Sequence, residues 1–384
     1  MEQFHYTSYA QDIIFGQGTL SQAGALAERF AWRRLMLCAT AGASGRGALA
    51  PIEAALGERL ALTYARVRPH VPEAEVAEAT DLAERHAIDA IIGFGGGSAI
   101  GAAKAVSLAL DGRHTGLPAR STTPMTQPVV PVLAIPTTYA GSEMTPTYGV
   151  TRLIDGVSQK VTVTDIRVTP KAVIYDPLLT LELPARETAG TGVNAIAHCV
   201  EALYSITRNP LSTATALAGL RALNHALPAC LENSAAVAAR DETLTGAHLA
   251  GMALAHVAMG LHHGICHVIG GATGAAHGDI NAIMLPHVLR FNLDVCAPQL
   301  ALAADALGVS AAGRDAPAIA QDVTQHITVL IERTPLPRRL RDLDIGERGL
   351  SELARLAFAS RTVRNNPKPI TDAAQIDTLL RAAW

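Results

Sequence analysis

In the amino-terminal part of the chain, short apolar or β-branched runs alternate with Ala-rich segments whose apolar positions recur at helical spacing. The runs at Leu35–Leu37, Ala87–Phe94 and Val129–Ile135 have the length and composition of buried strands. Strands that alternate with helices form a parallel sheet with helices on both faces. The pattern therefore predicts an α/β domain.

The pattern changes near Pro177. Residues 149–165 show the turn-flanked alternation of a β-hairpin, and residues 172–177 resemble one more buried strand. Beyond Pro177, long Ala- and Leu-rich segments with helical spacing run to the carboxyl end, broken by Gly and Pro. We therefore predict two domains, an α/β nucleotide-binding domain over residues 1–177 and an all-helical catalytic domain over residues 178–384.

Composition agrees with a folded chain of two domains. The 384 residues are 49% hydrophobic and 17% charged, which argues against disorder, and their number is too large for one compact core. The net charge of -3 is spread along the chain without a basic run. Nucleic acid is therefore not an expected partner.

The cysteines and the amino terminus indicate the cellular compartment, which we expect to be reducing. Five cysteines without a CxxC pair indicate reduced thiols rather than a disulfide framework. The first residues are polar and lack the pattern of a signal peptide, and the apolar stretch 247–261 carries His248 and His256. We expect a cytoplasmic protein without membrane spans.

A glycine-rich turn follows one predicted strand. Gly95, Gly96, Gly97 and Ser98 lead into a helix predicted to begin near Ala99. Glycines let a pyrophosphate approach the backbone, and the N–H groups of a helix amino terminus attract it. The spacing is not the G-x-G-x-x-G of dinucleotide-binding domains, so these glycines could also form only a tight turn.

A second polar loop follows the next predicted strand. It offers four hydroxyl groups, those of Thr137, Thr138, Ser142 and Thr145. Strand ends on one edge of a parallel sheet converge where ligands bind, so the two loops together favour a bound nucleotide. The alternative is that these hydroxyls only close turns through their own backbone.

The helical part carries polar residues at one-turn spacing. Asn194 and His198 are four residues apart, as are His263 and His267, and His277 follows before a glycine. An i,i+4 pair lies on one helix face, so these side chains could reach one pocket and act as metal ligands or as acids and bases. The alternative for each is a polar residue in a helix interface. Three other histidines could be packing or capping residues, and we assign no role to them: His256, His262 and His287.

These segments resemble the iron-containing alcohol dehydrogenase superfamily. Its motifs GGGS-x-x-D-x-x-K, PTT-x-x-x-GSE, G-x-D-A-x-x-H-x-x-E, H-x-x-x-H and H-G-x-x-N correspond here to GGGSAIGAAK, PTTYAGSE, GVNAIAHCVE, HGICH and HGDIN. The similarity runs from IIFGQGTL to LPHVLRFN. It implies the dehydroquinate synthase-like fold of iron-type alcohol dehydrogenases, with NADH or NADPH as cofactor.

The resemblance also implies a metal site that this sequence alters. An aspartate and three histidines bind the metal in metal-dependent members, and they correspond to Asn194, His198, His263 and His277. A neutral amide in place of the only anionic ligand leaves the cation's dehydration poorly offset. We expect no bound divalent metal; if one binds, the three histidines hold it.

Further differences resemble the maleylacetate reductase branch. They are Gly101 in place of aspartate, Tyr139 in PTTYAGSEMTP, and the motif N-A-x-A-H. Tyr139 joins the catalytic candidates, and Lys160, in the predicted hairpin, joins the cofactor-binding ones. Thr40 lies where NAD-selective relatives can carry an acidic residue, and without that carboxylate a 2′-phosphate is not repelled.

The branch implies reduction of maleylacetate, a dicarboxylate, to 3-oxoadipate in aromatic compound catabolism, by a homodimer. Hydride addition to the carbon β to the ketone places negative charge on the ketone oxygen. His198, His263 and His277 would hold the substrate or its enolate, and His263 or His267 would donate the proton. This chemistry requires the imidazoles to face the nicotinamide.

Three alternatives stay open. A metal-dependent alcohol dehydrogenase that tolerates Asn194 would contain metal and act on simple alcohols. A relative that acts on a sugar phosphate or polyol would be identified by a substrate panel. A non-catalytic nucleotide-binding protein would keep the glycine turn without turnover, but convergent proton donors argue against it.

Overall fold

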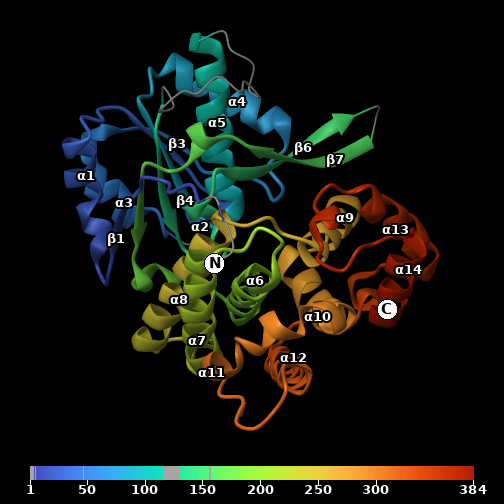
Figure 1. The fold of residues 1–384 in the computed structure, drawn as a ribbon. Helices are drawn as coiled ribbons and strands as arrows, with labels where there is room; N and C mark the ends of the chain where they lie inside the picture. Colours follow the sequence, from blue (N-terminus) through green and yellow to red (C-terminus); the bar gives the residue numbers. More distant parts are fainter. Residues whose placement is uncertain (1–3, 5, 46, 116–129, 155–156) are drawn as a thin grey trace. The chain divides into compact units, whose positions relative to one another are not determined.

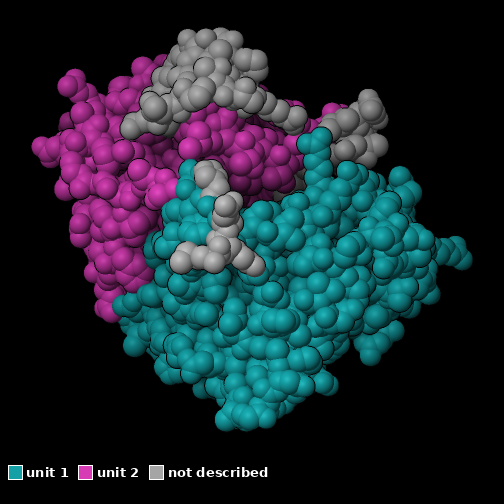
Figure 2. Space-filling model, viewed as in Figure 1, with its two compact units in different colours: residues 1–7, 183–384 teal, residues 8–182 magenta. Residues whose placement is uncertain are grey.

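The computed structural model describes the chain apart from residues 1–3, 5, 46, 116–129 and 155–156 (Figure 1). Its contacts divide the chain into two compact units, coloured separately in Figure 2. We call residues 8–182 the sheet unit and residues 183–384, together with residues 1–7, the helical unit. The α/β and all-helical classes predicted for the two parts of the chain are confirmed.

The sheet unit ends slightly beyond the predicted boundary at Pro177. Pro177–Thr180 form a short 3-10 helix, η5, whose first turn is capped by the Asp176 carboxylate. The same carboxylate accepts hydrogen bonds from the backbone N–H groups of Gly18 and Leu20. Because these bonds hold the segment against the start of the sheet unit, the unit extends to Glu182.

The sheet unit contains a six-stranded parallel sheet in the order β1-β8-β5-β4-β2-β3. Its strands are β1 (Asp12–Phe15), β2 (Leu35–Cys38), β3 (Leu60–Tyr64), β4 (Ala90–Gly95), β5 (Val132–Pro136) and β8 (Ala172–Tyr175). The predicted strands correspond to β2, β4, β5 and β8, although Val129 lies outside the described residues. The edge strands β1 and β3 were not among the predicted runs.

Helices cover both faces of the sheet (Figure 1). They are α1 (Ala23–Arg29), α2 (Ala41–Gly45), α3 (Ala50–Leu56), α4 (Glu73–Arg85) and α5 (Gly97–Thr115). Successive strand residues point to opposite faces, so Leu37 and Ile92 pack in a core with α1 and α3. Met36 and Ile91 pack in a second core with α4 and α5. Burial on both faces explains why the strands are continuous apolar runs.

The strand order reverses between β2 and β4. From β2 the chain continues to its neighbour β3 on one side, and from β4 to its neighbour β5 on the other. At such a switch point the loops that leave two adjacent strand ends diverge, and α/β proteins bind ligands in the crevice between them. Because β2 ends at Cys38 and β4 at Gly95, Thr40 and the glycine turn follow these two neighbouring strand ends.

The predicted hairpin is confirmed. β6 (Thr147–Ile154) and β7 (Val157–Thr164) form a separate two-stranded antiparallel sheet.

The helical unit contains only helices as regular structure in its described residues. They are α6 (Ala185–Tyr204), α7 (Pro210–Glu232), α8 (Val237–Ala255), α9 (Leu261–Thr273), α10 (His277–Ala301), α11 (Ala304–Leu307), α12 (Ala316–Glu332), α13 (Leu350–Ala359) and α14 (Ala373–Ala383). An apolar core joins α9, α10, α13 and α14. Within the described residues, no helix has both the length and the apolar character needed to cross a membrane.

Helices α6 and α10 approach closely where Gly278 faces Gly190. A Cβ placed on Gly278, in the first turn of α10, would lie 2.6 Å from the Cα of Gly190 on α6. A Cβ on Gly190 would lie 3.4 Å from the Cα of Gly278, an ordinary van der Waals distance. The contact is therefore closed to a side chain at Gly278 only.

The Gly278→Ala substitution should destabilise the protein by about 1–3 kcal/mol, because two helix backbones must separate to admit the methyl group. Gly190→Ala, at the same contact, should lie within about 0.5 kcal/mol of the natural protein, since no neighbour must move. Thermal unfolding of both variants measures the difference. Equal melting temperatures would show that the helices are not held at this distance.

Candidate active site

The glycine turn at the end of β4 needs glycine for conformational and steric reasons. Gly95 has φ +136°, a conformation that residues with a side chain rarely adopt. A Cβ on Gly96 would lie 3.2 Å from the side chain of Thr138. Helix α5 begins at Gly97, two residues before the predicted start, so its amino-terminal N–H groups lie in the turn itself. This arrangement fits a bound phosphate group.

The loop after β5 lies against the glycine turn. The backbone N–H of Thr137 donates to the carbonyl of Gly95 at 3.1 Å. The Thr138 hydroxyl is buried and has no hydrogen-bond partner among the described residues. A buried hydroxyl beside a glycine turn is suited to a ligand, so Thr138 fits a nucleotide in the expected place.

The loop's other hydroxyl residues differ in their surroundings. Ser142 begins the 3-10 helix η3 (Ser142–Met144) and is half-buried. Thr145 is buried, and its hydroxyl lies 3.0 Å from the carbonyl of Ser142 and 3.2 Å from that of Thr147. This geometry matches the alternative in which a threonine closes a turn, and it favours a structural role for Thr145.

The remaining candidates in the sheet unit are Thr40, Tyr139 and Lys160. The Thr40 hydroxyl accepts a hydrogen bond from the N–H of Ala43 at 3.3 Å, in the first turn after β2. Tyr139 is fully buried. Lys160 pairs with Thr151 in the hairpin, and its side chain lies outside the described part of the structure. Roles for these three residues stay predictions.

The helical unit brings the predicted histidines together. The rings of His198, on α6, and His263, on α9, stack with their centroids 4.6 Å apart. His267, on α9, and His277, at the start of α10, stack at 5.4 Å. The centroid of His263 lies 6.2 Å from that of His267 and 6.1 Å from that of His277. We call His198 and His263, which are buried, the inner pair, and the half-buried His267 and His277 the outer pair.

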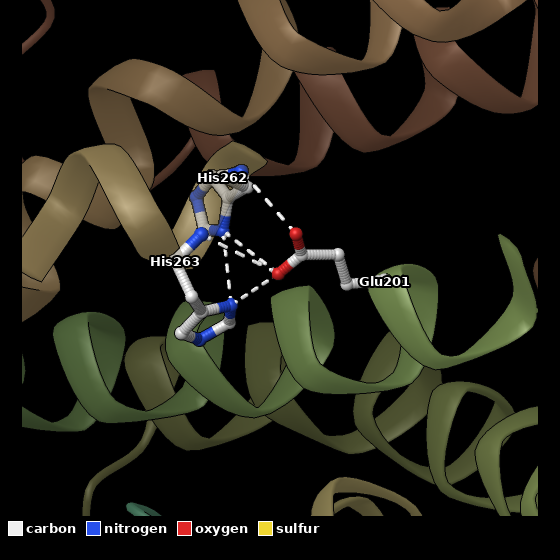
Figure 3. A group of neighbouring side chains, drawn as sticks. All are labelled: Glu201, His262 and His263. Atoms are coloured by element: carbon white, nitrogen blue, oxygen red, sulfur yellow. Dashed lines mark hydrogen bonds and ion pairs between the residues drawn. The ribbon is translucent and has the colours of Figure 1, made fainter. Parts of the chain in front are cut away.

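A buried carboxylate orients His263, one ring of the inner pair (Figure 3). Glu201, one turn after His198 on α6, lies 2.5 Å from His263 Nδ1. Its oxygens also accept the backbone N–H groups of Gly260 at 2.8 Å, His262 at 3.2 Å and His263 at 3.4 Å. These donors belong to the first turn of α9, which otherwise lacks acceptors. Glu201 thus caps α9 and orients the His263 ring at the same time.

The protonation states follow from these contacts. Burial alone would raise the pKa of Glu201, but the hydrogen bond and charge of His263 hold it below 4.5, so the carboxylate is ionised at neutral pH. Burial, and then the neighbouring imidazoles, lower the pKa of His198 well below 6.5. His198 is therefore neutral in this state, and the positive charge expected of the cluster cannot come from it.

Two nitrogens of the inner pair are available to a ligand. Among the described residues, neither His198 Nδ1 nor His263 Nε2 has a hydrogen-bond partner, although both are buried. Because His263 Nδ1 holds its proton against Glu201, Nε2 carries a lone pair in the neutral ring. The same nitrogen donates a proton when the ring is an imidazolium.

Asn194 is held by an amide on α10. The Nδ2 group of Asn281 donates to Asn194 Oδ1 at 2.8 Å, and both side chains are buried. The backbone carbonyl of Asn281 lies 3.3 Å from His262 Nε2. Asn281 therefore connects α6, α9 and α10 around the cluster.

Sequence analysis assigned no role to Glu201 and His262. The structure places both beside His263: His262 Nδ1 lies 3.3 Å from that of His263, and burial lowers the pKa of His262 to about 4. A signal for Glu201 was present, because it is the last residue of the motif G-x-D-A-x-x-H-x-x-E. Its position on the same helix face as His198 could have indicated a partner for a second histidine.

The described residues do not fit a divalent cation well. Ligand atoms of Glu201, His262 and His263 lie within 4.8 Å of one another, but a cation there would displace the hydrogen bond between Glu201 and His263. The set implied by the resemblance supplies imidazoles without a carboxylate, and its Asn194 Oδ1 already accepts from Asn281. The only anionic ligand of the first set already bonds to His263, and the second set has no anionic ligand.

Comparison with known proteins agrees with this geometry. Residues 10–177 match the family described as iron-containing alcohol dehydrogenase, and residues 188–384 match the carboxyl-terminal part of the same family. The chain belongs to the iron-containing alcohol dehydrogenase family. The family consists of oxidoreductases that use NAD(P), which agrees with the glycine turn at the switch point of the sheet.

Relatives of this family member align over its full length. A maleylacetate reductase of Burkholderia cepacia is 37% identical and covers 100% of this chain and 98% of its own. The crystal structure of maleylacetate reductase from Agrobacterium tumefaciens is 31% identical with a TM-score of 0.82, covering 100% and 99% of the two chains. That of a 1,3-propanediol oxidoreductase is 26% identical with a TM-score of 0.91, covering 100% of both.

The Glu201→Gln substitution should lower the free energy of unfolding by about 2–3 kcal/mol, because it replaces one acceptor oxygen by an NH2 donor that faces N–H groups in need of an acceptor. Glu242→Gln is the matched control, since Glu242 and His225 form a similar pair at 2.8 Å on the surface. Its effect should stay within about 0.5 kcal/mol. Urea denaturation compares the two, and equal stability would contradict the role given to Glu201.

Proposed function

We propose that this protein is a maleylacetate reductase that uses NADH or NADPH and needs no divalent cation. The proposal depends on one observation: Oδ1 of Asn194, in the histidine cluster, accepts a hydrogen bond from Asn281. At this position the metal-dependent members of the family carry an aspartate. The full-length similarity to maleylacetate reductases supports the same substrate.

Maleylacetate suits a site without a Lewis acid. Oxidation of an alcohol benefits from a cation that lowers the alcohol's pKa, whereas a conjugated ketone is already electrophilic. Its reduction requires hydrogen-bond donors where negative charge develops on the ketone oxygen. Bound NADH or NADPH supplies the hydride. The helical unit then has to stabilise an enolate and protonate the neighbouring carbon.

The inner pair has the properties that this task needs. Glu201 holds His263 at Nδ1, so the ring would present Nε2 to the substrate, and Nε2–H is the donor when the ring is an imidazolium. We propose His263 as the proton donor. The half-buried His267 and His277 would return the proton from solvent, since their ring centroids lie 6.2 and 6.1 Å from that of His263.

The substrate's two carboxylates would add negative charge beside the cluster. They would favour protonated forms of His263 and His277, whereas the buried, neutral His198 would take part through a hydrogen bond. The proposal requires one substrate molecule to reach both these imidazoles and the nicotinamide.

We also propose that the protein is cytoplasmic and forms a homodimer.

The glycine turn, Thr137, Thr138 and Ser142 would bind the cofactor's phosphates and nicotinamide half. Thr40, at the adjacent strand end, would lie near the adenosine ribose. Because Thr40 brings no carboxylate, we propose that both NADH and NADPH are accepted.

Purified protein should oxidise NADH when maleylacetate is added, with kcat/KM at least about 100-fold above that for simple aldehydes. The measurement is the loss of nicotinamide absorbance over a substrate panel that also contains alcohols with NAD⁺. His263→Gln should lower kcat with maleylacetate by about 100-fold or more, because the proton donor is lost. His225→Gln, at the exposed pair with Glu242, is its control. Turnover of alcohols without turnover of maleylacetate would favour the metal-dependent alcohol dehydrogenase instead.

A further inference from the structure

A lysine is fully buried beneath the second polar loop of the sheet unit. Lys104 lies two turns into α5, the helix that the glycine turn opens. Its Nζ donates to the backbone carbonyls of Ser142 at 2.6 Å, Thr145 at 2.7 Å and Thr147 at 3.0 Å. Three carbonyl acceptors match the three N–H donors of an ammonium group.

The three carbonyls belong to one short segment that turns around the lysine. Converging carbonyl oxygens repel one another and in other loops face water or a metal ion. Here the ammonium group takes the place of such an ion. The carbonyls of Ser142, Thr145 and Thr147 therefore point toward the lysine, which fixes the course of the backbone between them.

A second buried group holds the same loop. The Glu143 carboxylate accepts a hydrogen bond from the Tyr175 hydroxyl, on β8, at 2.8 Å. The Glu143 backbone carbonyl accepts from the Gln11 side chain at 2.9 Å. Burial lowers the pKa of Lys104 to about 7, while the charge of Glu143 acts in the opposite direction. The carboxylate thus helps to keep the lysine charged.

The loop held by Lys104 follows β5, and its first residues lie against the glycine turn. Thr137 donates to Gly95, and Thr138 contacts the position where a Gly96 side chain would lie. One helix therefore carries both supports of the second loop, the glycine turn at its amino terminus and Lys104 two turns later. A shift of the loop would move Thr137, Thr138 and Ser142 relative to the turn.

We propose that Lys104 is a positioning residue for the nicotinamide cofactor, because its ammonium group holds the second loop in the conformation that binds it. The proposal rests on the cofactor site of the proposed function. Lys104 itself does not touch the cofactor, since it is fully buried under the loop. Its effect is on the affinity for NADH rather than on the chemical step.

The test is a graded series at this position. Lys104→Gln keeps two N–H donors and Lys104→Met keeps none, at similar side-chain length. NADH binding is measured by fluorescence titration without maleylacetate, and kcat is measured at saturating NADH. We expect the Kd for NADH to rise in the order natural protein, Lys104→Gln, Lys104→Met, by about tenfold or more at the end of the series. The kcat at saturating NADH should stay within about threefold.

The control is Lys171→Met, which removes a lysine whose Nζ lies 5.5 Å from the ring centroid of Phe30, in the same unit. It should leave the Kd for NADH unchanged. If Lys104→Met does not fold, Lys104→Gln alone carries the comparison with Lys171→Met. An unchanged Kd in the Lys104 variants, or a loss of kcat without weaker NADH binding, would overturn the proposal. Failure of the natural protein to reduce maleylacetate while it binds NADH would overturn the proposed function and leave this inference standing.

Discussion

The helical unit depends on the compensation of one buried charge. The Glu201 side chain is 1% exposed, and an ionised carboxylate in such a place destabilises the fold by several kcal/mol unless donors surround it. The first turn of α9 supplies backbone N–H groups, and His263 supplies Nδ1. The carboxylate therefore determines where α9 begins relative to α6. The stacking of His263 on His198 follows from that placement.

The same constraint connects structure to chemistry. Because Glu201 occupies His263 Nδ1, only Nε2 of that ring is left for a substrate, and its neighbour His198 is neutral through burial. Asn281 holds Asn194 through the oxygen that a cation would need. A cluster of this kind donates hydrogen bonds and protons, which suits an enone more than an alcohol.

Periodicity predicted most of the fold and the pairs of site residues that share a helix face. Buried strands of a parallel sheet are continuous apolar runs, so β4 and β5 were recognisable, whereas the edge strands β1 and β3 are mostly half-buried and carry a weaker signal. Helical spacing placed His198 beside Asn194 and His263 beside His267. It could not show which residues neutralise the charge of Glu201 or donate hydrogen bonds to it. The partner of Glu201 comes from another helix, and the inward hydroxyl of Thr145 depends on Lys104, 41 residues away. Such long-range pairings are set by tertiary packing.

The most direct test of the account is the cation dependence of maleylacetate reduction. Protein stripped of metal by exhaustive chelation should oxidise NADH with maleylacetate at the rate of the untreated protein, and added Zn²⁺ or Fe²⁺ should not raise it. Asn194→Asp provides the comparison, because one carboxylate oxygen could accept from Asn281 while the other binds a cation, so this variant should gain affinity for Zn²⁺. Loss of activity in the stripped natural protein, restored by Fe²⁺ or Zn²⁺, would contradict the account.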